Sequence, residues 1–199
     1  MLTEGANTLV GTAGNDTFNA LEASVVVAGL TATLTALDNL DGGAGTDTLN
    51  VAATKATLDT TGLGLTVKNI EVANFQGTQI LTVDSSAWTG LTNLNVTKSV
   101  LAATLTAANT TDINVAGAEA AVTTNGGKSI TITQAMDKAA DVITVKGGGA
   151  VTVTATDSNA AAGGIDIGNT TAVTGAVVVN STGAKIVGGT TGTIVLDDI

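Results

Sequence analysis

The sequence predicts an all-β fold, a right-handed β-solenoid (β-helix) of short strands. From residue 48 onward, short runs in which Val, Ile or Leu alternates with Thr, Asn or Asp begin about every ten residues. The breaks between them are Gly, Ala, Ser and Asn, without Pro. Only Phe18, Phe75 and Trp88 are aromatic, which suits a narrow aliphatic core better than the wide core of a sandwich.

The expected strands share an alternation that places one face in the core and a β-branched, often Thr, face in solvent. They are 48–51, 70–75, 80–83, 94–96, 103–106, 112–115, 129–133, 142–145, 151–154, 165–167, 176–179, 185–187 and 193–196.

Two segments are predicted to depart from the solenoid pattern. Asn125-Gly126-Gly127 lies between the apolar runs 120–124 and 129–133, and two-residue turns need positive φ, so an antiparallel hairpin is expected there. Residues 134–141 carry Ala and Met and predict one short helical turn.

The composition excludes most catalytic chemistry. The 199 residues contain no His, Cys, Tyr, Pro or Arg, which removes Ser–His–Asp triads, Cys–His pairs, His-liganded zinc and arginine fingers. A pair of carboxylates could still act as in a glycosidase, but no two acids stand in an apolar context that would raise a pKa. We therefore expect a protein that is not an enzyme.

The charge balance points to cations as ligands. Seven Lys against 17 acidic residues give a net charge of −10, the wrong sign for nucleic acid or anionic lipid. Thirteen of the acids are Asp, which favours turns, where calcium is commonly bound. No apolar run approaches the roughly 20 residues of a membrane-spanning helix, so no membrane insertion is expected.

The N-terminus lacks the features of a classical secretory signal. Residues 1–4 form neither a basic region nor the start of an apolar one. Three alternatives stay open: a cytosolic protein, a fragment, or export by a route that reads no N-terminal signal.

The most specific signal is a glycine-rich phrase that occurs twice. Residues 42–50, GGAGTDTLN, match the nonapeptide G-G-x-G-x-D-x-U-x in full, and residues 11–19, GTAGNDTFN, match it with Thr12 in place of the second Gly. The glycines permit tight turns with carbonyls free to face a cation, the Asp supplies charge, and Phe18 or Leu49 anchors a short strand. A single phrase of this kind can also be a simple turn.

These phrases resemble the calcium-binding RTX (repeats-in-toxin) family. The longer series GTAGNDTF, LDGGAGTDTLNV, VKNIEVANF and LTVDSSAWTGLTNLNV is similar to RTX-type surface-layer proteins and related type I-secreted proteins of Gram-negative bacteria. The resemblance implies calcium as the cofactor, secretion to the cell surface, and a calcium-binding segment 1–51 followed by a β-solenoid (strand-repeat) region 52–199 that is continuous with it as one elongated domain. RTX repeats are usually tandem, whereas these two are 31 residues apart, which leaves the number of ions open.

The resemblance also implies a set of metal ligands. Asp16 and Asp47 are the expected side-chain ligands, and carbonyl groups come from three glycines of the two phrases. Two further acids flank the second copy and are candidates by proximity. The glycines are Gly14, Gly43 and Gly45, and the flanking acids are Asp38 and Asp41.

Three classes of function follow. The leading one is a structural, calcium-stabilised domain of an exported surface-layer protein that assembles with copies of itself. The alternative is a segment of a type I-secreted adhesin or biofilm protein that binds a carbohydrate or a surface. A polysaccharide-acting enzyme is third, because β-helix lyases and epimerases use His, Tyr or Arg, and none is present.

Overall fold

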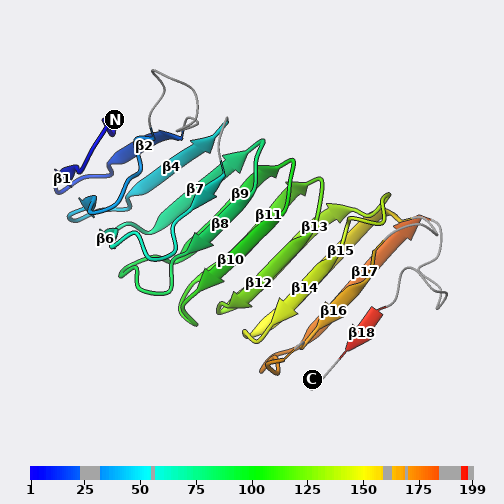
Figure 1. Ribbon diagram of the computed structural model, residues 1–199. Helices are drawn as coiled ribbons and strands as arrows, with labels where there is room; N and C mark the ends of the chain where they lie inside the picture. Colours follow the sequence, from blue (N-terminus) through cyan, green and yellow to red (C-terminus); the bar gives the residue numbers. More distant parts are fainter. Residues whose placement is uncertain (23–31, 55–56, 159–162, 169, 184–193, 197–199) are drawn as a thin grey trace.

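The computed structural model describes residues 1–22, 32–54, 57–158, 163–168, 170–183 and 194–196. Over these residues the chain forms eighteen β-strands and no helix. Every pairing between these strands is parallel. The predicted all-β solenoid is therefore confirmed, as the stacked strands of Figure 1 show.

The strands form three sheets. The eight-stranded sheet contains β2 (Thr17–Glu22), β4 (Thr48–Ala53), β7 (Val72–Gly77), β9 (Asn93–Ser99), β11 (Asp112–Ala118), β13 (Ser129–Ala135), β15 (Ala150–Ser158) and β17 (Val177–Gly183). The seven-stranded sheet contains β5 (Leu58–Asp59), β8 (Leu81–Asp84), β10 (Ala103–Ala107), β12 (Val122–Gly126), β14 (Ile143–Lys146), β16 (Ile165–Ile167) and β18 (Ile194–Leu196). The three-stranded sheet contains β1 (Thr8–Val10), β3 (Asn39–Asp41) and β6 (Thr66–Lys68).

Each coil places one strand in the eight-stranded sheet and, from β5 onward, one in the seven-stranded sheet, which accounts for the ten-residue cadence. Equivalent residues of β2 and β4 are 31 apart, those of β4 and β7 24 apart, and those of β11 and β13 only 17 apart. The longer first coils have a third side, the three-stranded sheet, which a single bridge between Lys68 and Thr89 extends. In the shorter coils that follow, a turn takes the place of this third side.

The core lies between the sheets, and its side chains form rows in which each coil contributes the residue at the equivalent position. Leu49, Leu94 and Ile113 occupy one such row of the eight-stranded sheet and are completely buried. Phe75 and Trp88 pack with ring centroids 6.4 Å apart inside the first coils. Both rings are buried and belong to the continuous core of the solenoid.

The predicted hairpin at residues 125–127 is wrong. β12 and β13 do not pair with each other: β12 pairs with β10 and β14, and β13 with β11 and β15. Gly126 and Gly127 do have positive φ values of 71° and 95°, but they form a corner that carries the chain from one sheet to the other. The same glycine chemistry serves both kinds of turn, so the local sequence does not distinguish them.

The predicted helical turn at 134–141 is also wrong. Its first two residues continue β13, and Met136 is buried and donates its amide to the Thr156 carbonyl of the next coil. Asp141 accepts the amides of Asp137 and Lys138 (3.0 and 2.7 Å), which closes a non-helical loop. Met136 therefore packs into the solenoid core and is not part of a helix.

The expected strand 185–187 and residue 193 lie outside the described residues. The boundary between 1–51 and 52–199 stays a prediction. In the described part of the chain, no helix is long and apolar enough to cross a membrane.

Candidate calcium site

Three corners of the solenoid stack on one another at its N-terminal end. Residues 11–16 join β1 to β2, residues 42–47 join β3 to β4, and residues 69–71 join β6 to β7. The Gly42 amide donates to the Lys68 carbonyl at 2.9 Å, which ties the second corner to the start of the third. The two glycine-rich phrases therefore become neighbours, and the short corner 69–71 is the third layer.

An acidic residue stands immediately before the strand in each of these corners. The Asp16 amide donates to Asp47 Oδ1 at 2.7 Å, and the Asp47 amide donates to Glu71 Oε2, also at 2.7 Å. Asp16, Asp47 and Glu71 precede paired neighbouring strands, whose backbones lie about 4.8 Å apart, so the three acidic residues form a column along the stack. A column of like charges at this separation favours a bound cation.

Glycines in the second corner let the coils approach closely. A Cβ atom on Gly42 would collide with the carbonyl oxygen of Asn69 and would lie 2.5 Å from Asp47 Oδ2. Gly43 has a φ of 93°, and a Cβ there would collide with the carbonyl oxygen of Thr12. The space beside Gly42 is thus bounded by one carboxylate oxygen and one carbonyl oxygen.

The two aspartates of the repeats differ in how their second carboxylate oxygen is satisfied. Asp47 is completely buried, and its Oδ2 has no hydrogen-bond partner. Asp16 Oδ2 accepts both the amide and the hydroxyl of Thr12, at 2.6 and 2.9 Å. A buried carboxylate oxygen without a donor is costly unless a cation or another group satisfies it.

Asp41 lies beside the column but is already paired. Its Oδ2 is 3.0 Å from Lys68 Nζ, and its Oδ1 accepts the side-chain amide of Asn69 at 2.8 Å. The hydrogen bond from Lys68, followed by that from Asn69, lowers the pKa of the Asp41 carboxyl below its usual value. Asp41 therefore holds corner 69–71 against β3.

Asp38 is fully buried in a different turn. Its Oδ1 accepts the backbone amide of Asn7 at 2.6 Å and the Asn7 side chain at 3.0 Å, and its Oδ2 accepts the Thr35 amide at 2.6 Å. Both oxygens are thus engaged in holding the chain that leads into β3.

The three glycines proposed as carbonyl donors are exposed on the outer side of the corners. Gly14 and Gly45 face each other across the first two coils, since a Cβ on Gly45 would lie 2.7 Å from the Gly14 oxygen. Gly43 stacks on Thr12. Among the described residues no three acidic side chains converge on a common point, so a bound ion would also need ligands other than carboxylates, such as backbone carbonyls.

Sequence reasoning missed Glu71 and the Asn69 carbonyl, and it did not foresee the hydroxyl bond of Thr12. Corner 69–71 has no glycine phrase, so motif matching passes over it. A signal was nevertheless present: Glu71 precedes its strand just as Asp16 and Asp47 do, at a spacing of 24 residues instead of 31.

The fold and the stacked glycine corners define a parallel β-solenoid with repeated acidic turns. The family model of the RTX calcium-binding nonapeptide repeat (4 copies) matches residues 2–22 and 37–53, which contain both glycine-rich corners. Over these residues the chain carries RTX-type calcium-binding repeats. No curated protein matches the chain.

The donor set of the corners fits calcium. Calcium takes about six to eight oxygen ligands, from carboxylates and carbonyls, in flexible geometry. The unpartnered Asp47 Oδ2 and the Asn69 carbonyl are two oxygen donors that both lie close to Gly42. The described corners offer no thiolate or imidazole, since the sequence contains no Cys or His.

Proposed function

We propose that the chain is a structural, non-enzymatic domain of an exported bacterial surface-layer protein, which calcium stabilises and which assembles with copies of itself. The observation that carries the proposal is the buried Asp47 Oδ2 without a partner, within a column of three acidic residues. Calcium would satisfy this oxygen and offset the repulsion between the carboxylates.

Coupled folding gives this arrangement a role in export. At low cytosolic calcium the acidic column opposes folding of the first coils, which keeps the chain competent for secretion. Extracellular modules bind calcium with a Kd of roughly 10⁻⁴–10⁻³ M. A site of this affinity stays empty at the low calcium concentration of the cytosol and is filled outside the cell. Binding free energy then contributes directly to folding free energy.

Calcium titration followed by far-UV circular dichroism and thermal unfolding tests the proposal. At a free calcium concentration ten times Kd, the stabilisation is about 1.4 kcal/mol, which raises the Tm by about 3–6 °C for a domain of this size. EGTA should reverse the change, and magnesium at the same concentration is the control. A Tm and spectrum that calcium leaves unchanged would refute the stabilising role.

Assembly is tested separately by electron microscopy and light scattering of the purified chain with calcium or EGTA. Ordered sheets or oligomers that form only with calcium are the expected result. A chain that binds calcium but stays monomeric at all concentrations contradicts the surface-layer role.

A second candidate function is that of an adhesin or biofilm matrix segment that binds a carbohydrate. It is favoured by a hollow of about 550 Å³ on the outer face of the eight-stranded sheet, lined in part by the amide side chains of Asn19, Asn50, Asn74 and Gln76. A glycan array probed in calcium distinguishes the two functions: specific glycan binding by a monomer supports the adhesin, and calcium-dependent assembly without glycan binding supports the surface layer.

A further inference from the structure

The two RTX repeats occupy equivalent positions, yet only one of them has a free ligand oxygen. Asp16 and Asp47 are paired in register, each directly before its strand. In the first repeat, Thr12 fills the place of the second glycine and gives two hydrogen bonds to Asp16 Oδ2. In the second repeat that place is Gly43, which has no hydroxyl and donates its amide to Asp41 instead (3.2 Å).

The Thr12 hydroxyl also fixes the first repeat internally. It accepts the Gly14 amide at 3.1 Å while it donates to Asp16 at 2.9 Å. The first corner is therefore satisfied by its own side chain, without any ion.

The free oxygen of Asp47 faces the third coil. The site of a Gly42 Cβ lies within 2.5 Å of both Asp47 Oδ2 and the Asn69 carbonyl oxygen, and Asn69 belongs to corner 69–71. Asn69 has a φ of 52°, a left-handed conformation that Asn tolerates better than most residues.

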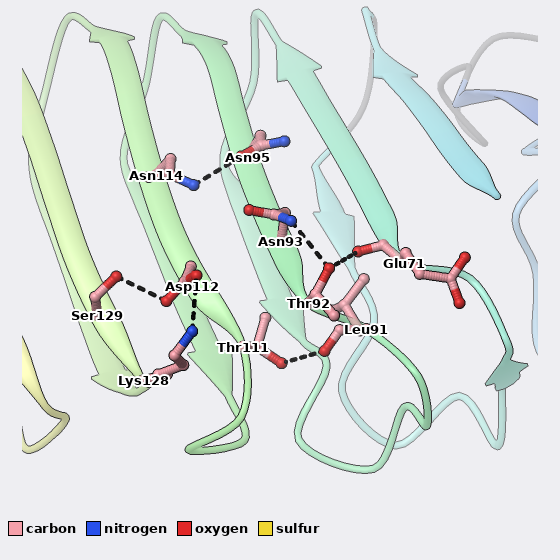
Figure 2. Close-up of polar contacts among 10 residues, drawn as sticks. All are labelled: Glu71, Leu91, Thr92, Asn93, Asn95, Thr111, Asp112, Asn114, Lys128 and Ser129. Carbon is pink, nitrogen blue, oxygen red and sulfur yellow. Dashed lines mark hydrogen bonds and ion pairs between the residues drawn. The ribbon is translucent and has the colours of Figure 1, made fainter. Parts of the chain in front are cut away.

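Glu71 adds a second carboxylate at the same boundary between coils. Its Oε2 accepts the Asp47 amide at 2.7 Å, and Figure 2 shows its carboxylate pointing away from Thr92. The acidic column ends here: Thr92 and Thr111 take the equivalent position in the next two coils, and their hydroxyls donate to the carbonyls of Glu71 and Leu91, at 3.0 and 2.9 Å.

We infer that the chain holds one calcium ion at this corner stack, between the second and third coils. Asp47, Glu71 and the Asn69 carbonyl hold the ion, and the first repeat is a metal-free copy in which the Thr12 hydroxyl takes the place of the ion. The inference rests on the proposed calcium function. It assigns the third coil, which lies outside the matched repeats, a direct part in calcium binding.

Isothermal titration calorimetry of the full chain with calcium chloride tests the assignment by stoichiometry. The wild-type chain should bind one ion at this stack. Asp47→Asn should weaken its binding at least about tenfold, because ligand charge sets calcium affinity. Asp16→Asn should leave both stoichiometry and affinity nearly unchanged.

Two further variants separate ion binding from folding. Glu71→Gln keeps an oxygen that accepts the Asp47 amide but removes one charge of the column, so it should weaken calcium binding severalfold without lowering the Tm in EGTA. Thr12→Gly removes the hydroxyl bond to Asp16 Oδ2, which then keeps only the backbone amide of residue 12, and should allow a second ion to bind. Thr12→Ser, which keeps the hydroxyl, should not.

The outcomes distinguish this inference from the proposed function. A wild-type chain that binds no calcium refutes the proposed function, and the inference with it. If the wild-type chain binds calcium but Asp16→Asn abolishes binding while Glu71→Gln does not alter it, the ion lies between the first two coils and the inference alone is overturned. A second ion bound by wild type at Asp16, unaffected by Thr12→Gly, overturns it as well.

Discussion

Gly42 is a residue at which the second and third coils approach each other closely. Replacement by Ala would drive a methyl group into the Asn69 carbonyl, which is backbone and cannot move without shifting the third coil. We expect Gly42→Ala to lower the free energy of unfolding in EGTA by about 1–3 kcal/mol, as other overpacked sites do. Urea unfolding measures the change.

Gly14→Ala is the matched control for Gly42→Ala. The nearest heavy atom to a Cβ at Gly14 is Thr12 Oγ1 at 3.8 Å, which is ordinary van der Waals distance. Its effect should stay within about 0.5 kcal/mol. Equal losses for the two variants would show that close approach is not what the second corner requires.

Asp141 makes stability depend on pH. Burial raises the pKa of its carboxyl, although the amides of Lys138 and Asp137 act in the opposite direction. Because the folded pKa lies above the unfolded value of about 3.8, the protonated folded state is favoured, and the contribution of Asp141 is lost as pH rises through the folded pKa.

The test of this dependence is Asp141→Asn, which keeps an oxygen for the two backbone amides and removes the charge. The variant should match wild type near pH 4 and become progressively more stable than wild type toward pH 7. Urea unfolding in EGTA at several pH values gives the difference. A difference that does not change with pH would contradict the assignment.

At the scale of the strands, an asparagine ladder runs along the outer face of the eight-stranded sheet. Each side-chain amide donates to the Asn oxygen of the preceding coil at 2.9–3.1 Å, and Figure 2 shows its last step. The ladder consists of Asn19, Asn50, Asn74, Asn95 and Asn114. It ties five coils together outside the core.

The ladder predicts that internal members matter more than terminal ones. Asn74→Ala removes two ladder bonds and should cost about 1–3 kcal/mol, whereas Asn114→Ala removes one and should cost about half as much. Thermal or urea unfolding of both variants measures the ratio. Equal costs would mean that the bonds do not act as a ladder.

The alternation of apolar and polar residues predicted some strands correctly and missed others. Alternation located most strands from 48 onward, because the outward and inward faces of a strand differ chemically. It failed at Gly126 and Gly127, where positive φ served a corner between sheets, and at Leu58–Asp59 and Thr66–Lys68, which are too short to show a period. Strands of two or three residues exist because the neighbouring coil pairs with them.

For the whole molecule, the solenoid places any calcium at one end of a nearly one-dimensional stack. Each coil contacts mainly its neighbours, so stabilisation should decline with distance from the bound ion. Hydrogen exchange with mass spectrometry should show calcium-dependent protection that is greatest in β3, β4, β6 and β7 and absent by β14. Equal protection in all strands would indicate either a single cooperative unit or binding elsewhere.

The sequence by itself determined the class of fold, the start of a strand about every ten residues, and the glycine-rich turns with Asp16 and Asp47. Only the tertiary structure decided which of these aspartates keeps an unsatisfied oxygen and that Glu71 and Asn69 lie beside it. The physical reason is that coil length varies, from 31 to 24 to 21 residues in the first coils, so equivalent positions have no fixed spacing along the chain. Backbone pairing between coils sets the register. Every residue has a backbone carbonyl, so the residue type does not reveal which carbonyl binds an ion.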